Sequence, residues 1–312
     1  MNNAHYWSQR NLNATRAKHH YFKMENTFYD EIAKSINRTN EYIASPIKGI
    51  DLTKLSDDTP QLNINFWNIT SDRCAYLIRT DRENDNRDKR ITVLNFASYK
   101  NPGGMFLNGS FAQEESLCHK STLYNVLKEY QGSYYEHHRR SLNRSLYTND
   151  ALYSPDIVFQ TETKSGVTIF YKVDVITCAA PNVKAAKKYH NVSDAECLET
   201  LVDRIAFVLD VARANDVDIL IAGAFGCGVF GNKLEDVATA FAIMITNYYH
   251  HFFDEIVFPI PNMFVSDISF KIFKDTFFNI IKEINIERRG GVSNNYQYLK
   301  IKNAINNAHN KK

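Results

Sequence analysis

Hydrophobic side chains recur with two different spacings along this chain. Phe28, Ile32 and Ile36 are four residues apart, which places them on one face of a helix over about residues 14–43. In residues 62–67, apolar and polar side chains alternate, as expected of a half-buried strand. The N-terminal part of the chain therefore predicts one helix followed by one strand.

The same two spacings continue to alternate through the rest of the sequence. Residues 91–96 form a short apolar, β-rich run typical of a buried strand, and a helical stripe begins at residue 113. A Ser-Asp-Ala-Glu capping pattern opens a long amphipathic helix over residues 193–215. Further elements are expected as strands at 157–159, 167–179, 217–222 and 255–260, and as helices at 233–250 and 269–284.

Alternating strands and helices are typical of an α/β fold, with a mostly parallel sheet covered on both faces. We expect a helical extension with the first strand over residues 1–90 and the core over 91–285. Residues 286–312 are rich in Asn and Lys and poor in apolar side chains, so they predict a mobile tail. Residues 79–90 are highly charged and predict a solvated loop.

Composition narrows the class of protein. The chain has 312 residues, of which 44% are hydrophobic and 23% charged, and its net charge is +2. This charge predicts no general nucleic-acid surface, so a polyanionic ligand would need a local pocket. The N-terminus lacks a secretion pattern and no apolar run is long enough to span a bilayer. We expect a monomer in the cytoplasm or nucleus that does not bind membranes.

Metal and disulfide chemistry are not predicted. The five cysteines are an odd number without a CxxC pair. The histidine pairs at 19–20, 137–138 and 250–251 are adjacent residues, which point in different directions from a helix. We therefore expect no metal and no cofactor.

One segment combines glycines with paired acids directly after the predicted strand at 91–96. Glycines let a backbone approach a ligand, and acids in the first turn of a helix can hold sugar hydroxyls and supply a proton. Alone, such glycines are commonly tight turns, and such a Glu commonly complements the helix dipole. The candidate site residues here are Asn101, Gly103, Gly104, Met105, Gln113, Glu114 and Glu115.

A second glycine loop follows the predicted strand at 217–222 and precedes a helix, in the same layout. Successive exposed N–H groups in such a loop can bind phosphate without a lysine, and no Walker motif is present. Its candidate binding residues are Gly226, Cys227, Gly228, Val229, Phe230 and Gly231.

These motifs resemble those of the microbial-type poly(ADP-ribose) glycohydrolases, which have a macrodomain fold. The segment 101–118 is similar to the family's diphosphate loop and catalytic Gln-Glu-Glu, and the segment 223–232 to its second phosphate-binding loop. Residues 179–182, Ala-Ala-Pro-Asn, resemble the segment between them. The resemblance spans about residues 28–284 and implies a macrodomain-like three-layer α/β/α fold with an extra N-terminal helical region.

The resemblance implies hydrolysis of the ribose–ribose bonds of poly(ADP-ribose) from chain ends, with release of ADP-ribose. Cleaving a ribose acetal needs an acid at the leaving oxygen and then a base for water. We expect Glu115 to fill both roles with a raised pKa, and Glu114 to stay ionised and bind ribose hydroxyls. Asn95 and Asn101 can both orient the distal ribose, and we place Asn101 in the site.

One position departs from the family's pattern, because Met105 stands where its third consecutive glycine is usual. If this position requires a positive φ, a Met there would cost about 1–2 kcal/mol. Phe230 is expected to pack on the ribose or adenine.

Three other functions stay open at this point. The chain could bind ADP-ribose without cleaving it, or hydrolyse another ADP-ribose derivative, or be a scaffold whose glycines only form tight turns. ADP-ribosylated proteins are the expected partners of either enzyme.

Overall fold

The computed structural model describes residues 3–43, 62–81, 86, 88–262 and 267–309. The chain divides into two compact units. Unit 1 comprises the described residues of Met1–Ile43, Thr70–Ser141 and Asp150–Ala179, and unit 2 those of Ala44–Ile69, Leu142–Asn149 and Ala180–Lys312.

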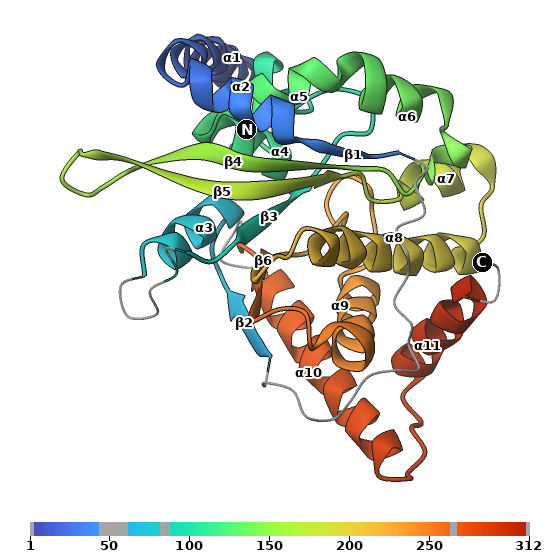
Figure 1. Ribbon diagram of the computed structural model, residues 1–312. Coiled ribbons are helices and arrows are strands. Elements are labelled where there is room, and N and C mark those ends of the chain that lie inside the picture. The colour runs from blue at the N-terminus through green and yellow to red at the C-terminus, as the bar shows by residue number, and fades with distance from the viewer. Residues whose placement is uncertain (1–2, 44–61, 82–85, 87, 263–266, 310–312) are drawn as a thin grey trace. The chain divides into compact units, whose positions relative to one another are not determined.

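Unit 1 holds four strands in the order β1-β4-β5-β3 (Figure 1). The strands β3 and β5 are parallel, whereas β4 is antiparallel to both β1 and β5. Its strands are β1 (Asn40–Tyr42), β3 (Ile91–Phe96), β4 (Ala151–Glu162) and β5 (Thr168–Cys178). Its helices and helical turns are α1 (Asn3–Thr27), α2 (Tyr29–Arg38), α3 (Ser71–Arg79), η1 (Phe106–Asn108), α4 (Gln113–Lys120), α5 (Leu123–Leu127), η2 (Lys128–Tyr130), η3 (Gln131–Tyr135) and α6 (Glu136–Arg140).

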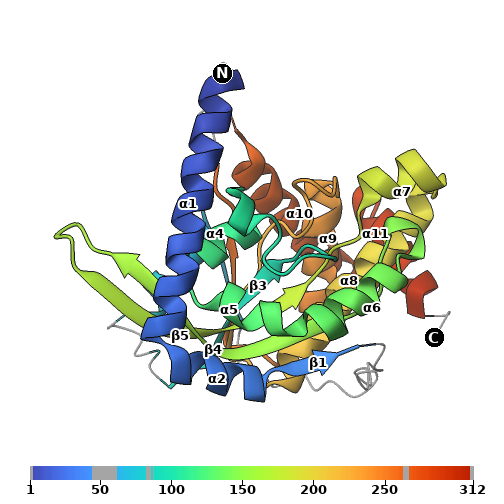
Figure 2. The same cartoon turned by 90° about the horizontal axis from the view of Figure 1, so that it is seen from above.

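Helices of unit 1 pack on these strands and on one another. The helix α4 contacts β3 and β4, and α3 contacts β3, β5 and α4. The long helix α1 runs beside α5 and the turn η1 (Figure 2). Five of the six side chains of β3 are buried, because covering elements leave little of it exposed to water. This packing holds the end of β3 next to the start of α4.

Unit 2 holds three parallel strands in the order β6-β7-β2. The long helix α8 begins where Ser193 Oγ accepts a hydrogen bond from the N–H of Glu196 (3.2 Å), as the capping pattern predicts. Its strands are β2 (Asn63–Trp67), β6 (Ile219–Ile221) and β7 (Glu255–Pro259). Its helices and turns are η4 (Asn143–Ser145), α7 (Val183–His190), α8 (Asp194–Ala214), α9 (Leu234–Met244), η5 (Ile245–Tyr249), α10 (Ser269–Arg288) and α11 (Tyr296–His309).

The predicted α/β class is confirmed, and three of the five strand pairings within the two units are parallel. The strongly periodic elements are also found near their predicted positions, among them β3, α8 and α10. The domain boundaries at residues 90 and 285 stay predictions. Part of the predicted charged loop, residues 82–85 and 87, lies outside the described residues.

The N-terminal segment differs from the single helix expected over residues 14–43. Phe28 has φ −125° and ψ 35°, which ends α1 and separates it from α2. Residues 40–42 form the strand β1, which pairs with β4. The helical spacing of apolar residues cannot reveal this strand, because its pairing partner is about a hundred residues away.

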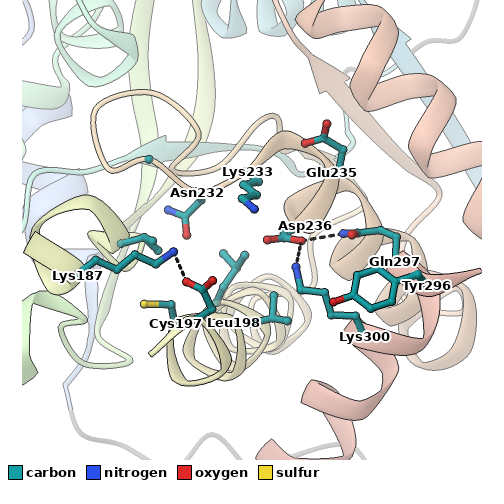
Figure 3. A pocket seen from close by; sticks show the side chains of 14 residues that line it. Lys187, Cys197, Leu198, Asn232, Lys233, Glu235, Asp236, Tyr296, Gln297 and Lys300 are labelled. Carbon is teal, nitrogen blue, oxygen red and sulfur yellow. Dashed lines mark hydrogen bonds and ion pairs between the residues drawn. The ribbon is translucent and has the colours of Figure 1, made fainter. Parts of the chain in front are cut away.

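The prediction of a mobile tail is wrong for the C-terminal helix α11, which packs on α8 and α9. Tyr298 and Ile301 are buried, with 2% and 0% of their surface exposed. Lys300 forms an ion pair with Asp236 (2.7 Å), and Gln297 donates a hydrogen bond to the same carboxylate (2.7 Å) (Figure 3). A few buried side chains and these polar contacts hold the helix although its overall composition is polar.

The segments around α11 enclose a pocket of about 470 Å³ in unit 2 (Figure 3). Acidic and basic side chains line it in equal number, and Lys187 is paired with Asp194 as Lys300 is with Asp236. Val183, Leu198 and Leu201 contribute apolar side chains to its lining. Because its charges balance, the pocket is not an obvious anion site.

We expect Ile301→Ala to lower the free energy of unfolding by about 2–4 kcal/mol, because it removes a fully buried side chain and leaves a cavity. Leu299→Ala is the matched control on the same helix, since Leu299 is 37% exposed, and it should cost less than about 1 kcal/mol. Urea unfolding of both variants measures the difference. Equal small effects would show that α11 does not pack as described.

Candidate active site

The two acids Glu114 and Glu115 lie where the sequence predicts them, in the first turn of α4. Both are buried, with 4% and 7% of their surface exposed. The loop that joins β3 to α4 passes directly over them. A Cβ atom built on Gly104 would lie 2.5 Å from Glu115 Oε1 and 3.0 Å from Glu114 Oε2. Both carboxyl groups therefore face the backbone of the same glycine.

The Glu115 carboxylate is held by two backbone groups. Its Oε1 accepts a hydrogen bond from the N–H of Met105 (2.9 Å), and its Oε2 accepts one from the N–H of Ala112 (3.0 Å). The second bond is the contact of a helix N3 acid with the residue before the helix. Glu115 thus ties the glycine loop to the start of α4.

The Glu114 carboxyl group faces the end of β3. Its Oε2 accepts a hydrogen bond from the N–H of Ser98 (2.7 Å), and its Oε1 accepts one from Asn95 Nδ2 (3.3 Å). Burial raises the pKa of Glu114 to about 8, the Ser98 N–H opposes this rise, and the nearby charge of Glu115 adds to it. This direction runs against the expectation that Glu114 stays ionised, because burial favours the protonated form of its carboxyl group.

This raised pKa makes the stability of the protein depend on pH. Glu114 titrates near pH 8 when folded and near its ordinary value of 4.5 when unfolded, so between these values the folded state binds more protons. Stability is therefore expected to fall as pH rises from about 5 to 8. Glu114→Gln has no such titration and should not lose stability in this range. The difference in melting temperature between the variant and the wild type should therefore change in favour of the variant as pH rises toward 8. If plots of melting temperature against pH ran parallel for the wild type and Glu114→Gln from pH 5 to pH 9, the raised pKa of Glu114 would be contradicted.

The glycine loop places glycines, and not Met105, at its positions of positive φ. Gly103 and Gly104 have φ of +61° and +60°, the left-handed region that favours glycine. Met105 has φ −108°, and its side chain is 40% exposed. The strain considered for a Met in place of the family's third glycine is therefore absent.

The same loop does not offer the free backbone donors that were expected of it. The N–H groups of Gly104 and Phe106 bond to the carbonyls of Asn101 and Gly103, and that of Met105 bonds to Glu115. The loop in this state therefore holds a carboxylate in place rather than presenting an anion nest.

Two further predicted residues have different surroundings. Gln113 Oε1 accepts a hydrogen bond from the N–H of Phe96 (2.8 Å), and its Nε2 donates to the carbonyl of Leu94 (2.9 Å). Both ends of this amide are used to fasten β3 to α4. The side-chain amide of Asn101, by contrast, bonds to no described residue, and its ability to bind a ribose stays a prediction.

Three residues that surround Glu114 were not placed in the site from the sequence, although Asn95 was considered for orienting the ribose. Asn95 is fully buried and donates to Glu114 and to Thr177 Oγ1 (3.3 Å). Ser98 supplies the shortest hydrogen bond to Glu114. The fully buried Tyr135 lies near enough for the charge of Glu114 to add to the rise that burial causes in its pKa. A polar Asn within the apolar strand 91–96 was the available signal for Asn95, whereas Tyr135 gives none.

The second glycine loop, in unit 2, retains free backbone donors. The N–H groups of Gly228, Val229 and Phe230 bond to none of the described residues, and Val229 is 78% exposed. Gly226 and Gly231 have positive φ of 73° and 75°. Three successive unpaired N–H groups form an arrangement suited to phosphate oxygens.

This loop is braced from one side by the segment that resembles the family's Ala-Ala-Pro-Asn. Asn232 Nδ2 donates to the carbonyls of Pro181 (2.9 Å) and Gly226 (3.0 Å). A Cβ atom on Gly226 would lie 2.5 Å from the Cβ of Ala180, so only glycine fits there. Phe230 is half-buried, 6.0 Å from the Tyr147 ring, and its packing on a ribose or adenine stays a prediction.

The comparison with protein families agrees with this geometry. Residues 8–161 match the family model "Microbial-type PARG, catalytic domain". These residues belong to the microbial-type PARG family. The match includes β3, the first glycine loop and both acids of α4. The resemblance read from the motifs is therefore confirmed, and the chain is an enzyme of the glycoside-hydrolysing class.

Solved structures with the same fold come from two bacteria. The poly(ADP-ribose) glycohydrolase of Thermomonospora curvata is 25% identical with a TM-score of 0.72, covering 85% of this chain and 99% of that one. The same enzyme bound to the inhibitor ADP-HPD is 26% identical with the same TM-score and coverage. The enzyme of Deinococcus radiodurans in complex with ADP-ribose is 28% identical with a TM-score of 0.69, covering 80% and 98%. The macrodomain-like α/β class is thereby confirmed.

A search of curated proteins gave no significant match. Within the described residues, no helix is long and apolar enough to cross a membrane. In the same part of the chain, no group of three or more His, Cys, Asp or Glu side chains is placed to hold a metal ion.

Proposed function

We propose that this chain hydrolyses the ribose–ribose O-glycosidic bonds of poly(ADP-ribose) and releases ADP-ribose from chain ends. The observation that carries the proposal is the pair of buried acids over Gly104, inside the residues that match the catalytic domain. The complexes of the relatives with ADP-ribose and ADP-HPD support a ligand of this chemistry. ADP-ribosylated proteins are the proposed partners.

In the proposed reaction, Glu115 acts first as the acid and then as the base. It donates its proton to the leaving ribose oxygen as the bond from the anomeric carbon to that oxygen breaks. Water then attacks the anomeric carbon and gives its proton back to Glu115. Adjacent acids on one helical turn do not straddle a sugar, so one carboxyl group that changes role fits better than an inverting pair.

Glu114 has a supporting part in this proposal. Because its raised pKa keeps it neutral near pH 7, it can donate a hydrogen bond to a ribose hydroxyl as well as accept one. A neutral Glu114 also avoids placing two like charges beside each other. Asn95 and Ser98 hold it in position.

Ligand binding is proposed for each glycine loop separately, from the groups that each loop itself offers. The free N–H groups of residues 228–230 are suited to phosphate, and Asn101 has a free amide suited to a ribose hydroxyl. We include Gly103, Gly104, Met105 and Gln113 as residues that shape the site around Glu115.

A direct assay tests the proposal. Purified protein is mixed with poly(ADP-ribose) labelled at its distal end, and the products are separated by chromatography over time. Early appearance of labelled ADP-ribose supports release from chain ends, whereas early appearance of labelled oligomers shows internal cleavage. Binding of ADP-ribose without any product would favour a binding protein. Release from a mono-ADP-ribosylated target alone would favour a different hydrolase.

A further inference from the structure

The exposed face of α1 carries positive charges that form no ion pair with the acidic side chains of the described residues. Residues 8–24 contain four Lys or Arg side chains and no Asp or Glu. Of these, Arg16, Lys18 and Lys23 are exposed. None of the three forms an ion pair with any described residue, whereas Lys128 on a neighbouring turn is paired with Glu25 (2.9 Å). Since the whole chain has a net charge of only +2, this concentration of charge is local.

A lysine from α4 extends the same positive surface. Lys120 at the end of α4 also lacks an ion pair with the described residues. His20 of α1 is buried, which lowers its pKa; the hydrogen bond with the Ser121 carbonyl opposes this, and the charges of Lys23, Lys120 and His19 lower the pKa further. Lys23 of α1 and Lys120 of α4 therefore both lie near His20, and Figure 2 shows α1 beside α4. Unpaired like charges that gather in this way favour a polyanionic partner.

Two exposed aromatic rings lie at the ends of a continuous row of rings between α4 and α1. Phe111 is 58% exposed and Phe22 is 60% exposed. Phe111 stacks on His119 (4.7 Å between ring centroids), which contacts Phe106. The row continues through the ring contacts Phe106–Tyr124, Tyr124–Tyr21 and Tyr21–Phe22. The row thus connects the residue three positions before Glu114 with the exposed face of α1.

The N-terminal half of α1 is fixed against the loop that carries the site. Arg10 Nε donates a hydrogen bond to the carbonyl of Asn108 (3.0 Å). A Cβ atom on Gly109 would lie 2.1 Å from the carbonyl oxygen of Arg10, so the two backbones touch. The basic and aromatic side chains are therefore held at a set position relative to Glu115.

We propose that these side chains form a second contact surface for the poly(ADP-ribose) chain, outside the place where its bond is cleaved. The α1 surface, as we name it, consists of Arg16, Lys18, Phe22, Lys23, Phe111 and Lys120. It binds the pyrophosphates of further ADP-ribose units through the basic side chains and their adenines by stacking on the two phenylalanines. This inference rests on the proposed function, and it predicts that the enzyme prefers long polymers to short ones.

Binding measurements on a charge-reduced variant test the α1 surface. The variant carries Arg16→Gln, Lys18→Gln, Lys23→Gln and Lys120→Gln in a Glu115→Gln background, which prevents turnover. The control carries Lys164→Gln, Lys188→Gln, Lys274→Gln and Lys282→Gln in the same background, with the same loss of charge at lysines that belong neither to α1 nor to α4. Fluorescence anisotropy measures the Kd for a long poly(ADP-ribose) chain and for ADP-ribose, at several salt concentrations.

The α1 variant should bind the long chain at least tenfold more weakly than the control, with an unchanged Kd for ADP-ribose. Its plot of log affinity against log salt should also be shallower by about 3, since each lost phosphate contact removes about 0.7. Phe22→Ala with Phe111→Ala should weaken polymer binding while leaving this salt slope unchanged.

Equal polymer affinities of the variant and the control would overturn the inference, even if the wild-type protein releases ADP-ribose. If the wild type cleaves no polymer but the α1 variant still loses polymer affinity, the proposed function fails and the surface stands. The α1 surface would also not be specific for poly(ADP-ribose) if single-stranded oligoadenylate of equal charge displaced the polymer at equal concentration. That result would overturn the assignment of this surface to poly(ADP-ribose).

Discussion

Glu115→Gln is expected to lower the kcat for release of ADP-ribose by about 10²–10⁴-fold, the usual contribution of a positioned acid–base group. The amide cannot donate a proton to the leaving oxygen or accept one from water, although it has almost the same size. The N–H groups of Met105 and Ala112 donate to the two different oxygens of the carboxylate, and the amide keeps one of these oxygens as an acceptor. The loop should therefore keep one of its two hydrogen bonds to residue 115, and binding of ADP-ribose should be retained.

The measurement combines a time course of product release with titration of ADP-ribose into the same preparation. Glu129→Gln is the matched control, because Glu129 lies in unit 1 with half of its side chain exposed. The control should keep wild-type turnover. If Glu115→Gln kept it as well, the proposed acid–base role would be wrong. If Glu114→Gln lost turnover and Glu115→Gln did not, the acid–base role would belong to Glu114.

Gly104→Ala is expected to lower turnover by about 10²-fold and to destabilise the fold. At φ +60° a side chain costs about 1–2 kcal/mol. In addition, the new Cβ would lie 2.5 Å from Glu115 Oε1 and 3.0 Å from Glu114 Oε2, so at least one carboxyl group must move. A displacement of about 1 Å in a catalytic group is enough for a loss of this size.

The control for this substitution is Gly132→Ala, also in unit 1. A Cβ atom on Gly132 meets nothing within 4 Å, and its φ lies outside the positive region. Its melting temperature and turnover should match those of the wild type. Turnover within a factor of about three of wild type in Gly104→Ala would show that the two carboxyl groups do not need their present positions.

Much of the fold could be predicted because its signals are local. The apolar run of β3, the serine that caps α8 and the placement of two acids at the start of α4 all depend on residues a few positions apart. The prediction of a mobile tail at α11 was wrong for a related reason. Its overall composition is polar, and the sequence does not show that Tyr298 and Ile301 would meet α8 and α9.

The candidate site divides in the same way. The glycines at 103 and 104 and the acids at 114 and 115 could be identified from residue types, because backbone freedom and acid–base chemistry belong to those residues. The fastening of β3 by Gln113, in contrast, joins residues about twenty positions apart, and the contact of Asn95 with Thr177 joins positions farther apart still. Such contacts have no fixed spacing in a sequence.

The sequence by itself determined which groups this protein has for cleaving a sugar bond and in which turns they stand. Only the tertiary structure decided their surroundings: that burial raises the pKa of Glu114, that Met105 is unstrained, and that Glu115 is tied to the loop. The physical reason is that a residue carries its chemistry with it, whereas burial and hydrogen-bond partners are supplied by elements that folding brings together from distant parts of the chain.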